Sequence, residues 1–126
     1  MNVQCTEAEW KIMEVLWERA PRTMPEITKA LQPATNWSRH TVITLLKRMQ
    51  EKGAVLVDET GPVKTYTPLV KREDAVRSET RRLLNHAFAG RPILLVQTLV
   101  DAGEVTEQEM EALLAYIRDN KPRGGS

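Results

Sequence analysis

The sequence contains a single cysteine, Cys5, among its 126 residues. One cysteine cannot form an intramolecular disulfide or a metal cage made of cysteines alone, and such cysteine usage is typical of the reducing cytosol. The two histidines, His40 and His86, lie far apart and have no neighbouring cysteine or carboxylate at metal-ligand spacing. We therefore expect no metal site and no cofactor. Cys5 is interpreted as incidental, with a redox role as the alternative.

Aromatic residues and long apolar runs are also scarce. Aromatics make up 5% of the chain, so a large aromatic-lined active-site cleft is not expected. No apolar run approaches the ~20 residues needed to span a bilayer, and the first four residues lack the pattern of a signal peptide. The sequence has no glycine-rich phosphate loop and no ordered catalytic triad, so we predict no enzymatic activity. We expect a cytoplasmic protein without membrane insertion.

The charge is nearly balanced, with 18 Lys and Arg against 17 Asp and Glu, for a formal net charge of +1. A strongly basic composition would indicate nucleic-acid binding directly, and this composition does not. Any contact with nucleic acid must therefore come from a local group of basic residues.

Three predicted helix starts have the same signature, a threonine followed three residues later by a glutamate. In such a capping box the threonine hydroxyl accepts the glutamate amide, and the glutamate carboxylate accepts the threonine amide. The pairs are Thr6 with Glu9, Thr23 with Glu26, and Thr106 with Glu109. Each pair precedes apolar residues at helical spacing, so the sequence predicts a mainly α-helical protein.

Apolar periodicity predicts three helices in the first half of the chain, over about 7–18, 24–31 and 39–52. We expect Pro33 to end the second helix, because proline cannot donate the next helical hydrogen bond. We expect Gly53 to follow the third helix with a positive φ. The residues expected to face inward on the first two helices are Trp10, Met13, Leu16, Trp17, Ile27, Ala30 and Leu31.

After Gly53 the pattern changes from helical to alternating, which indicates strands. Residues 54–57 and 63–68 are expected to pair as a β-hairpin, with Gly61 supplying a positive φ in the turn. Three helices followed by one hairpin is the element order of a winged helix-turn-helix. We therefore predict a mainly α fold with a small β-hairpin, and a DNA-binding domain over residues 1–70.

The third helix has two contrasting faces, and this contrast is the main functional signal. Val42, Leu45, Leu46 and Met49 form an apolar stripe. Between Arg39 and Gly53 four basic residues oppose one acidic residue, a local net charge of +3. Such a helix can enter the major groove, where its polar side chains reach bases and phosphates. The predicted DNA-binding residues are Ser38, Arg39, His40, Thr41, Ile43, Thr44, Lys47 and Arg48, with Lys64, Thr65 and Tyr66 of the hairpin.

Two alternatives to DNA binding remain at this point. A polar helix face can simply be solvated, and a winged helix can bind proteins without touching DNA. A solvated face would typically carry Glu and Lys pairs, whereas this face carries hydroxyl and imidazole groups. The hairpin that follows directly has Lys64 in a position to contact the DNA backbone. Both features favour DNA as the partner.

The second half of the chain returns to helical periodicity, with helices expected over about 72–89 and 93–100 and a last one after Thr106. This part is only about fifty residues long, too short to bury a core well alone. Its apolar stripes need a partner, either a second copy of the chain or, alternatively, its own first domain. Residues 71–121 are predicted to be a helical dimerisation domain and residues 122–126 a disordered tail. The predicted dimer residues are Leu83, Leu84, Ala87, Leu94, Leu95, Leu99, Met110, Leu113, Leu114 and Ile117.

These motifs together resemble the penicillinase-repressor family, the BlaI, MecI and CopY relatives. The segments that carry the resemblance are Thr6–Trp17, Trp37–Ser38, Thr41–Met49, Glu51–Gly53 and Lys64–Pro68. The resemblance covers roughly Thr6 to Asn120. It implies a homodimeric winged-helix repressor on a palindromic double-stranded operator, with interleaved C-terminal helices. It also implies control of genes for β-lactam resistance, peptidoglycan sensing or metal homeostasis.

The sequence departs from the family pattern in three places. Ile43 stands where some relatives carry a basic residue on the recognition helix, so the resemblance does not predict the operator sequence. Relatives that respond to β-lactam are cut at an Asn-Phe bond in the second C-terminal helix. The matching pair here is Thr98-Leu99, which is a candidate cleavage site for a membrane-bound sensor protease. The copper-responsive relatives carry C-terminal Cys-x-Cys motifs, and their absence here excludes copper sensing by that chemistry.

Overall fold

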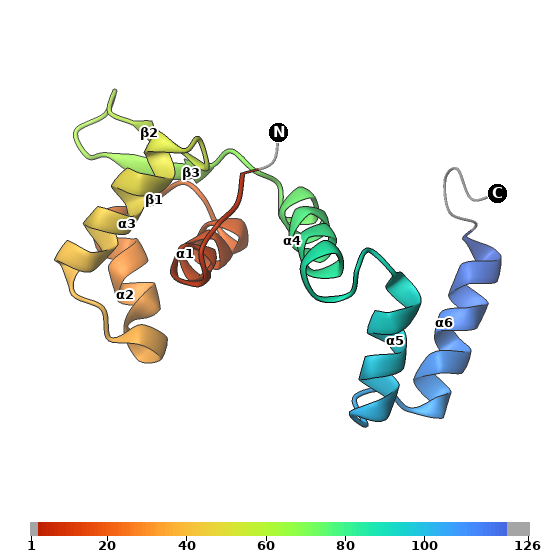
Figure 1. The fold of residues 1–126 in the computed structure, drawn as a ribbon. Coiled ribbons are helices and arrows are strands. Elements are labelled where there is room, and N and C mark those ends of the chain that lie inside the picture. Colours follow the sequence, from red (N-terminus) through yellow and green to blue (C-terminus); the bar gives the residue numbers. More distant parts are fainter. Residues whose placement is uncertain (1–2, 121–126) are drawn as a thin grey trace. The chain divides into compact units, whose positions relative to one another are not determined.

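The computed structural model describes residues 3–120 as a mainly helical chain with one small antiparallel sheet (Figure 1). The predicted fold class is confirmed. The chain divides into two compact units, the N-terminal unit (Met1–Thr80) and the C-terminal unit (Arg81–Ser126). Within the described range, no helix has both the length and the apolar character needed to cross a membrane. The tail predicted over 122–126 lies outside the described residues.

Three helices and a three-stranded sheet build most of the N-terminal unit, with the helices grouped together and the sheet beside them (Figure 1). Helix α4 begins in this unit and ends in the C-terminal one, which also holds α5 and α6. The elements are α1 (Glu7–Glu18), β1 (Arg22–Thr23), α2 (Met24–Thr35), α3 (Arg39–Glu51), β2 (Val55–Asp58), β3 (Thr65–Pro68), α4 (Arg72–Ala87), α5 (Pro92–Asp101) and α6 (Glu107–Asp119).

The three predicted capping boxes are all present, at the starts of α1, α2 and α6. Their hydrogen bonds measure 2.8–3.3 Å between backbone nitrogen and side-chain oxygen. At the end of α3, Gly53 adopts a φ of +84° as predicted. The amides of Gly53 and Ala54 donate to the carbonyls of Gln50 and Met49 over 3.1 and 2.8 Å. Because glycine tolerates this left-handed conformation, α3 ends abruptly and β2 begins two residues later.

The predicted end of the second helix at Pro33 is wrong, because α2 continues to Thr35. A proline in a helix lacks one amide donor, and the carbonyl that loses its partner here belongs to Lys29. Lys29 is exposed, so water can satisfy that carbonyl. The helix ends instead at Asn36, which has a left-handed φ of 55° and donates its amide to Gln32 over 3.0 Å.

One hydrophobic core holds the N-terminal unit together. Its buried members are Ile12, Met13, Leu16, Ile27, Leu31, Val42, Leu45, Leu46, Met49, Ala54 and Val55. Trp10 and Trp17, which were predicted to be buried on α1, are only half-buried. The prediction that Ala30 faces inward is wrong. The buried stripe of α2 runs through Ile27 and Leu31, four residues apart, and leaves Ala30 exposed at its side.

The sheet contains a strand that the sequence did not predict. Its order is β1-β3-β2, so the expected hairpin gains β1 as a third strand, with Arg22 opposite Tyr66 and Thr23 opposite Thr65. A strand of two residues is too short to show an alternating pattern. The other strands differ slightly from their predicted bounds, since β2 starts and ends one residue later and β3 starts two residues later.

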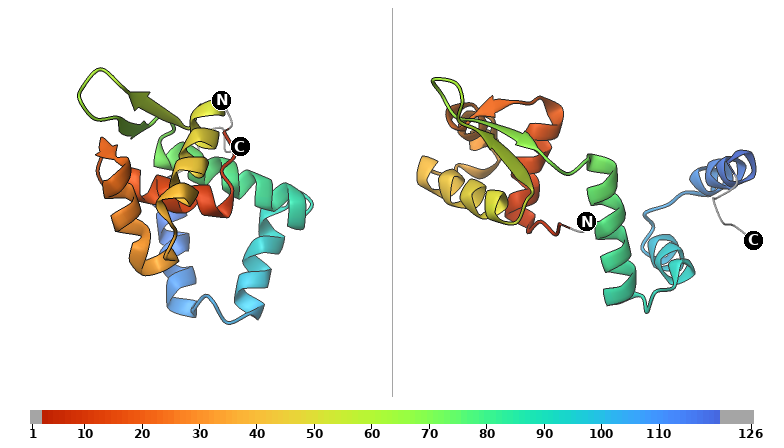
Figure 2. Two further views of the ribbon diagram at one scale, coloured as in Figure 1. Left: turned by 90° about the vertical axis from the view of Figure 1, so that its left-hand side faces the viewer. Right: turned by 90° about the horizontal axis from the view of Figure 1, so that it is seen from above.

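The loop between β2 and β3 projects beyond the helices of the unit (Figure 2). The prediction that Gly61 has a positive φ is wrong, because within the described part of the chain only Gly53, Gly90 and Gly103 are glycines of that kind. Here the Asp58 carboxylate accepts the amide and hydroxyl of Thr60 over 2.9 and 2.6 Å. This local turn reverses the chain without a left-handed glycine.

The first turn of α4 is fastened to α1. The Arg72 guanidinium donates to the Glu14 carboxylate over 2.7 Å and lies 5.5 Å from the centroid of the Trp17 ring. The Trp17 indole donates to the carbonyl of Val70 over 2.8 Å. These contacts hold the segment that follows the sheet against the body of the N-terminal unit.

Candidate nucleic-acid interface

Helix α3 is seated firmly by its inner face. Val42 and Met49 have no exposed surface and Leu46 is 1% exposed, so this side of the helix packs in the hydrophobic core. At the start of the helix the Ser38 hydroxyl accepts the amide of Thr41 over 3.2 Å. A cap and a packed inner face fix the rotation of α3, which determines the side chains that it presents outward.

The opposite side of α3 carries most of the predicted DNA-binding residues. We define the α3 outer face as the exposed residues Arg39, His40, Ile43, Thr44, Lys47 and Arg48. Ser38 is exposed as well, but its hydroxyl is occupied as the helix cap. Thr41 is half-buried, and its hydroxyl lies 3.1 Å from that of Ser38. The structure therefore brings six of the eight predicted α3 positions onto one exposed surface and ties the other two into the cap.

The cations of the α3 outer face make no direct contact with a carboxylate in the described part of the chain. Over residues 3–120, Arg39, Lys47 and Arg48 form no ion pair and no side-chain hydrogen bond. Several other cations of the N-terminal unit, among them Arg19, Arg22 and Arg72, are paired with carboxylates. A helix that gathers unpaired cations on one exposed side is suited to an anionic partner, because that partner supplies the missing opposite charge.

Lys52, which contributed to the predicted local charge of +3, is not part of this surface. Its ammonium nitrogen lies 2.6 Å from Glu9 Oε1 and 2.9 Å from the carbonyl oxygen of Gln4. Burial would raise the pKa of Glu9, but the hydrogen bonds from Lys52 and Thr6 outweigh it and lower the pKa. This pair was not predicted from the sequence, although Glu9 precedes the inward residues of α1 at helical spacing and its burial could have been recognised.

Of the three hairpin residues predicted to bind DNA, Lys64, Thr65 and Tyr66, only Lys64 is exposed. Lys64 is exposed, and its ammonium lies 3.4 Å from the carboxylate of Glu59 in the same loop. Thr65 and Tyr66 are half-buried in β3, and Tyr66 packs against the core. A surface ion pair is worth at most about 1 kcal/mol, so Lys64 can exchange Glu59 for a phosphate at little cost. Of the three predicted wing residues, Lys64 has the most accessible polar group.

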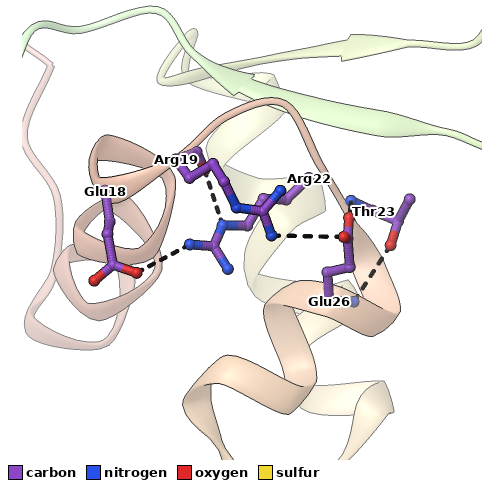
Figure 3. A network of polar contacts seen from close by, with 5 residues as sticks. All are labelled: Glu18, Arg19, Arg22, Thr23 and Glu26. Atoms are coloured by element: carbon purple, nitrogen blue, oxygen red, sulfur yellow. Dashed lines mark hydrogen bonds and ion pairs between the residues drawn. The ribbon is translucent and has the colours of Figure 1, made fainter.

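A second polar network connects α1, β1 and α2 (Figure 3). The Arg22 guanidinium is almost buried and donates to the carbonyl of Arg19 over 2.8 Å and to Glu18 over 3.2 Å. Arg19 in turn lies 3.6 Å from Glu26, the capping glutamate of α2. The contacts of Arg19 and Arg22, which connect α1 with the start of α2, were not predicted from the sequence.

The predicted dimer residues have mixed exposure. Leu84 is 7% exposed, whereas Leu94, Leu95 and Met110 are half-buried and Ala87 is exposed. The remaining five form what we call the C-terminal apolar group: Leu83, Leu99, Leu113, Leu114 and Ile117. Each of these five side chains is 37–46% exposed. Over 92–119, neither α5 nor α6 has a fully buried residue. The described C-terminal helices therefore leave apolar surface in contact with water.

The candidate cleavage pair Thr98-Leu99 lies inside α5 rather than in a loop. The Thr98 hydroxyl donates to the carbonyl of Leu94 over 2.8 Å. A protease must bind its substrate in an extended form, so cleavage at this bond requires local unwinding of α5.

Several known proteins similar to this chain are repressors of one family. The sequence profile of the family described as "Penicillinase repressor" matches residues 5–119. A penicillinase repressor of Bacillus licheniformis is 27% identical over 120 residues, which cover 95% of this chain and 94% of the relative. The methicillin resistance regulatory protein MecI of Staphylococcus aureus is 24% identical over 110 residues, covering 87% of this chain and 89% of the relative.

Two solved structures resemble more than half of the chain. The DNA-binding domain of the repressor BlaI in solution matches with a TM-score of 0.51 and 34% identity, covering 56% of this chain and 87% of that one. The monomeric form of B. licheniformis BlaI in complex with the blaP half-operator also matches with a TM-score of 0.51, at 33% identity, covering 57% and 88%.

Proposed function

Because the chain belongs to the penicillinase repressor family of transcriptional repressors, we propose that it binds operator DNA through the α3 outer face. The observation that carries this proposal is the set of unpaired cations, Arg39, Lys47 and Arg48, on a helix whose opposite side is fixed in the core. Arginine and lysine meet phosphates and guanine edges, and the rigid seat of α3 keeps them in register with the groove. The solved half-operator complex of a relative supports the same partner.

The working form of the repressor is a homodimer on a palindromic operator. In this proposal residues 1–70 bind DNA and residues 71–121 join the two copies. Its support is the exposed C-terminal apolar group, since apolar side chains in water gain free energy when a partner covers them. Two identical copies related by a two-fold axis would place two α3 helices on successive major grooves, which matches a palindrome.

The regulated genes belong to β-lactam resistance or to related functions of the cell envelope. This assignment comes from the names of the relatives, a penicillinase repressor and a methicillin resistance regulator. A membrane-bound sensor protease that cuts at Thr98-Leu99 is one route of release. A different signal is the alternative, because the bond lies within a helix and differs from the Asn-Phe pair of the β-lactam-responsive relatives. The protein acts in the cytoplasm, by binding rather than by catalysis.

Fluorescence anisotropy with labelled genomic fragments, at two salt concentrations, tests the proposal. We expect tight binding to a small subset of fragments and a steep loss of affinity with salt, since each neutralised phosphate contributes about one unit to the logarithmic slope. The matched comparison is a variant with Arg39, Lys47 and Arg48 changed to alanine. This variant should lose the tight binding and most of the salt dependence. Unchanged anisotropy for every fragment would indicate that this winged helix serves protein interaction instead.

A further inference from the structure

Ile43 is an anomaly on the α3 outer face. It is a branched apolar side chain that is 42% exposed in the middle of a surface otherwise made of polar and cationic groups. It lies one helical turn from Arg39 on one side and from Lys47 on the other, so charged side chains flank it along the helix. Single exposed apolar residues are common on protein surfaces. Ile43 is of interest because it lies in the middle of the surface proposed to bind DNA, between Arg39 and Lys47.

The hydroxyl groups around Ile43 have limited capacity to read bases. The Thr44 hydroxyl donates to the carbonyl of His40 over 3.0 Å, so its hydrogen is directed back into the helix. The hydroxyls of Ser38 and Thr41 are engaged with each other in the cap. Among the uncharged side chains near the middle of α3, the groups left to face a base are therefore the side chain of Ile43 and the methyl and oxygen lone pair of Thr44.

The major groove offers one apolar group to such a side chain. Adenine, guanine and cytosine present hydrogen-bond donors and acceptors there, and thymine alone adds a methyl group. Isoleucine cannot satisfy a donor or an acceptor, so covering the amino group of cytosine or adenine with it would cost a hydrogen bond to water. A thymine methyl against Ile43 would instead remove apolar surface of both groups from water.

We propose that Ile43 is a specificity-determining residue that selects a thymine in each half-site by contact with its methyl group. This inference rests on the proposed function, because it requires α3 to lie in the major groove. On the α3 outer face the cations then supply most of the affinity for DNA, and Ile43 adds discrimination at one base pair to that of the other side chains that reach bases.

The test uses the full-length protein and an operator fragment selected by it from a random-sequence DNA pool. Each thymine of the half-site is replaced in turn by deoxyuridine, which removes only the methyl group. For the wild-type protein one replacement should weaken binding by about fourfold, the expected effect of one buried carbon. For Ile43→Ala the same replacement should have no effect. At that position 5-methylcytosine should bind the wild type more tightly than cytosine does.

Lys47→Ala is the matched control on the neighbouring turn. It should weaken binding to all fragments and lower the salt slope by about one unit, while keeping the response to deoxyuridine. Circular dichroism checks that each variant is folded, which is expected because both side chains are exposed. If the wild type selects a site but no deoxyuridine replacement distinguishes it from Ile43→Ala, the inference about Ile43 is wrong while DNA binding stands. If no DNA is selected at all, the proposed function itself fails.

Discussion

The ammonium group of Lys52, at the end of α3, forms a 2.6 Å contact with the fully buried carboxylate of Glu9 in the first turn of α1. The same carboxylate oxygen accepts the backbone amide of Thr6 in the capping box. Its other oxygen, Oε2, is buried and has no hydrogen-bond partner among the described residues. One ion pair therefore connects the end of the helix proposed to read DNA with the start of α1, and among the described residues Lys52 is the cation that pairs with Glu9.

Lys52→Ala should destabilise the N-terminal unit by about 1–3 kcal/mol, because it leaves the buried Glu9 carboxylate without its cation. Urea unfolding followed by tryptophan fluorescence measures this change. Lys47→Ala on the same helix is the control, since Lys47 is exposed and unpaired and its loss should change stability by less than about 0.5 kcal/mol. Equal effects of the two substitutions would contradict the structural role of the pair.

Stability should fall in acid through Glu9. Its pKa is lowered in the folded protein despite burial, because Lys52 and Thr6 hydrogen-bond to the charged form. The contribution is thus fully present above the ordinary glutamate value of 4.5 and is lost as the pH falls below that value through the folded-state pKa. The urea midpoint of wild type and Glu9→Gln, measured from neutral pH to pH 3, checks this. A Glu9→Gln profile that falls as steeply as the wild type would assign the acid sensitivity to other carboxylates.

Arg48→Ala should weaken operator binding by about 1–3 kcal/mol and reduce discrimination between operator and random DNA. Thr44→Ala should also reduce discrimination, without changing the salt slope. Both variants should sediment like the wild type. Lys11→Ala removes another exposed, unpaired cation, but from α1, and should bind the operator like the wild type. Anisotropy titrations compare the four proteins, and wild-type affinity in Arg48→Ala and Thr44→Ala would show that the α3 outer face is misassigned.

Leu114→Asp should weaken dimerisation, and operator affinity with it, by placing a charge in the apolar contact between copies. Leu114 is 46% exposed within one chain, so the substitution should leave the folded monomer intact. Leu95→Asp should act in the same direction. Gln108→Asp introduces the same charge at an exposed polar position of α6 and should have no effect. Analytical ultracentrifugation measures the outcome, and an unchanged sedimentation coefficient for both leucine variants would place the dimer contact elsewhere.

Most helices of the described chain could be predicted from the sequence because their signals are local. A capping box involves residues three apart, and a glycine such as Gly53 ends a helix through its own backbone freedom. The apolar stripe of α3 likewise repeats every three or four residues, a pattern visible in the sequence itself. For the same reason the periodicity also predicts which side chains of α3 are exposed, and the residues of the α3 outer face are indeed exposed.

What the tertiary structure decided are the contacts between distant residues. Helix α2 continues through Pro33 next to an exposed turn at Lys29, and β1 exists only because β3 pairs with it. The sequence determined which residues of α3 face outward, since one helix has one periodicity. It could not determine that Lys52 pairs with Glu9 while Arg39, Lys47 and Arg48 form no ion pair among the described residues. The reason is that Glu9 lies 43 positions from Lys52, and packing, not spacing along the chain, brings the two together.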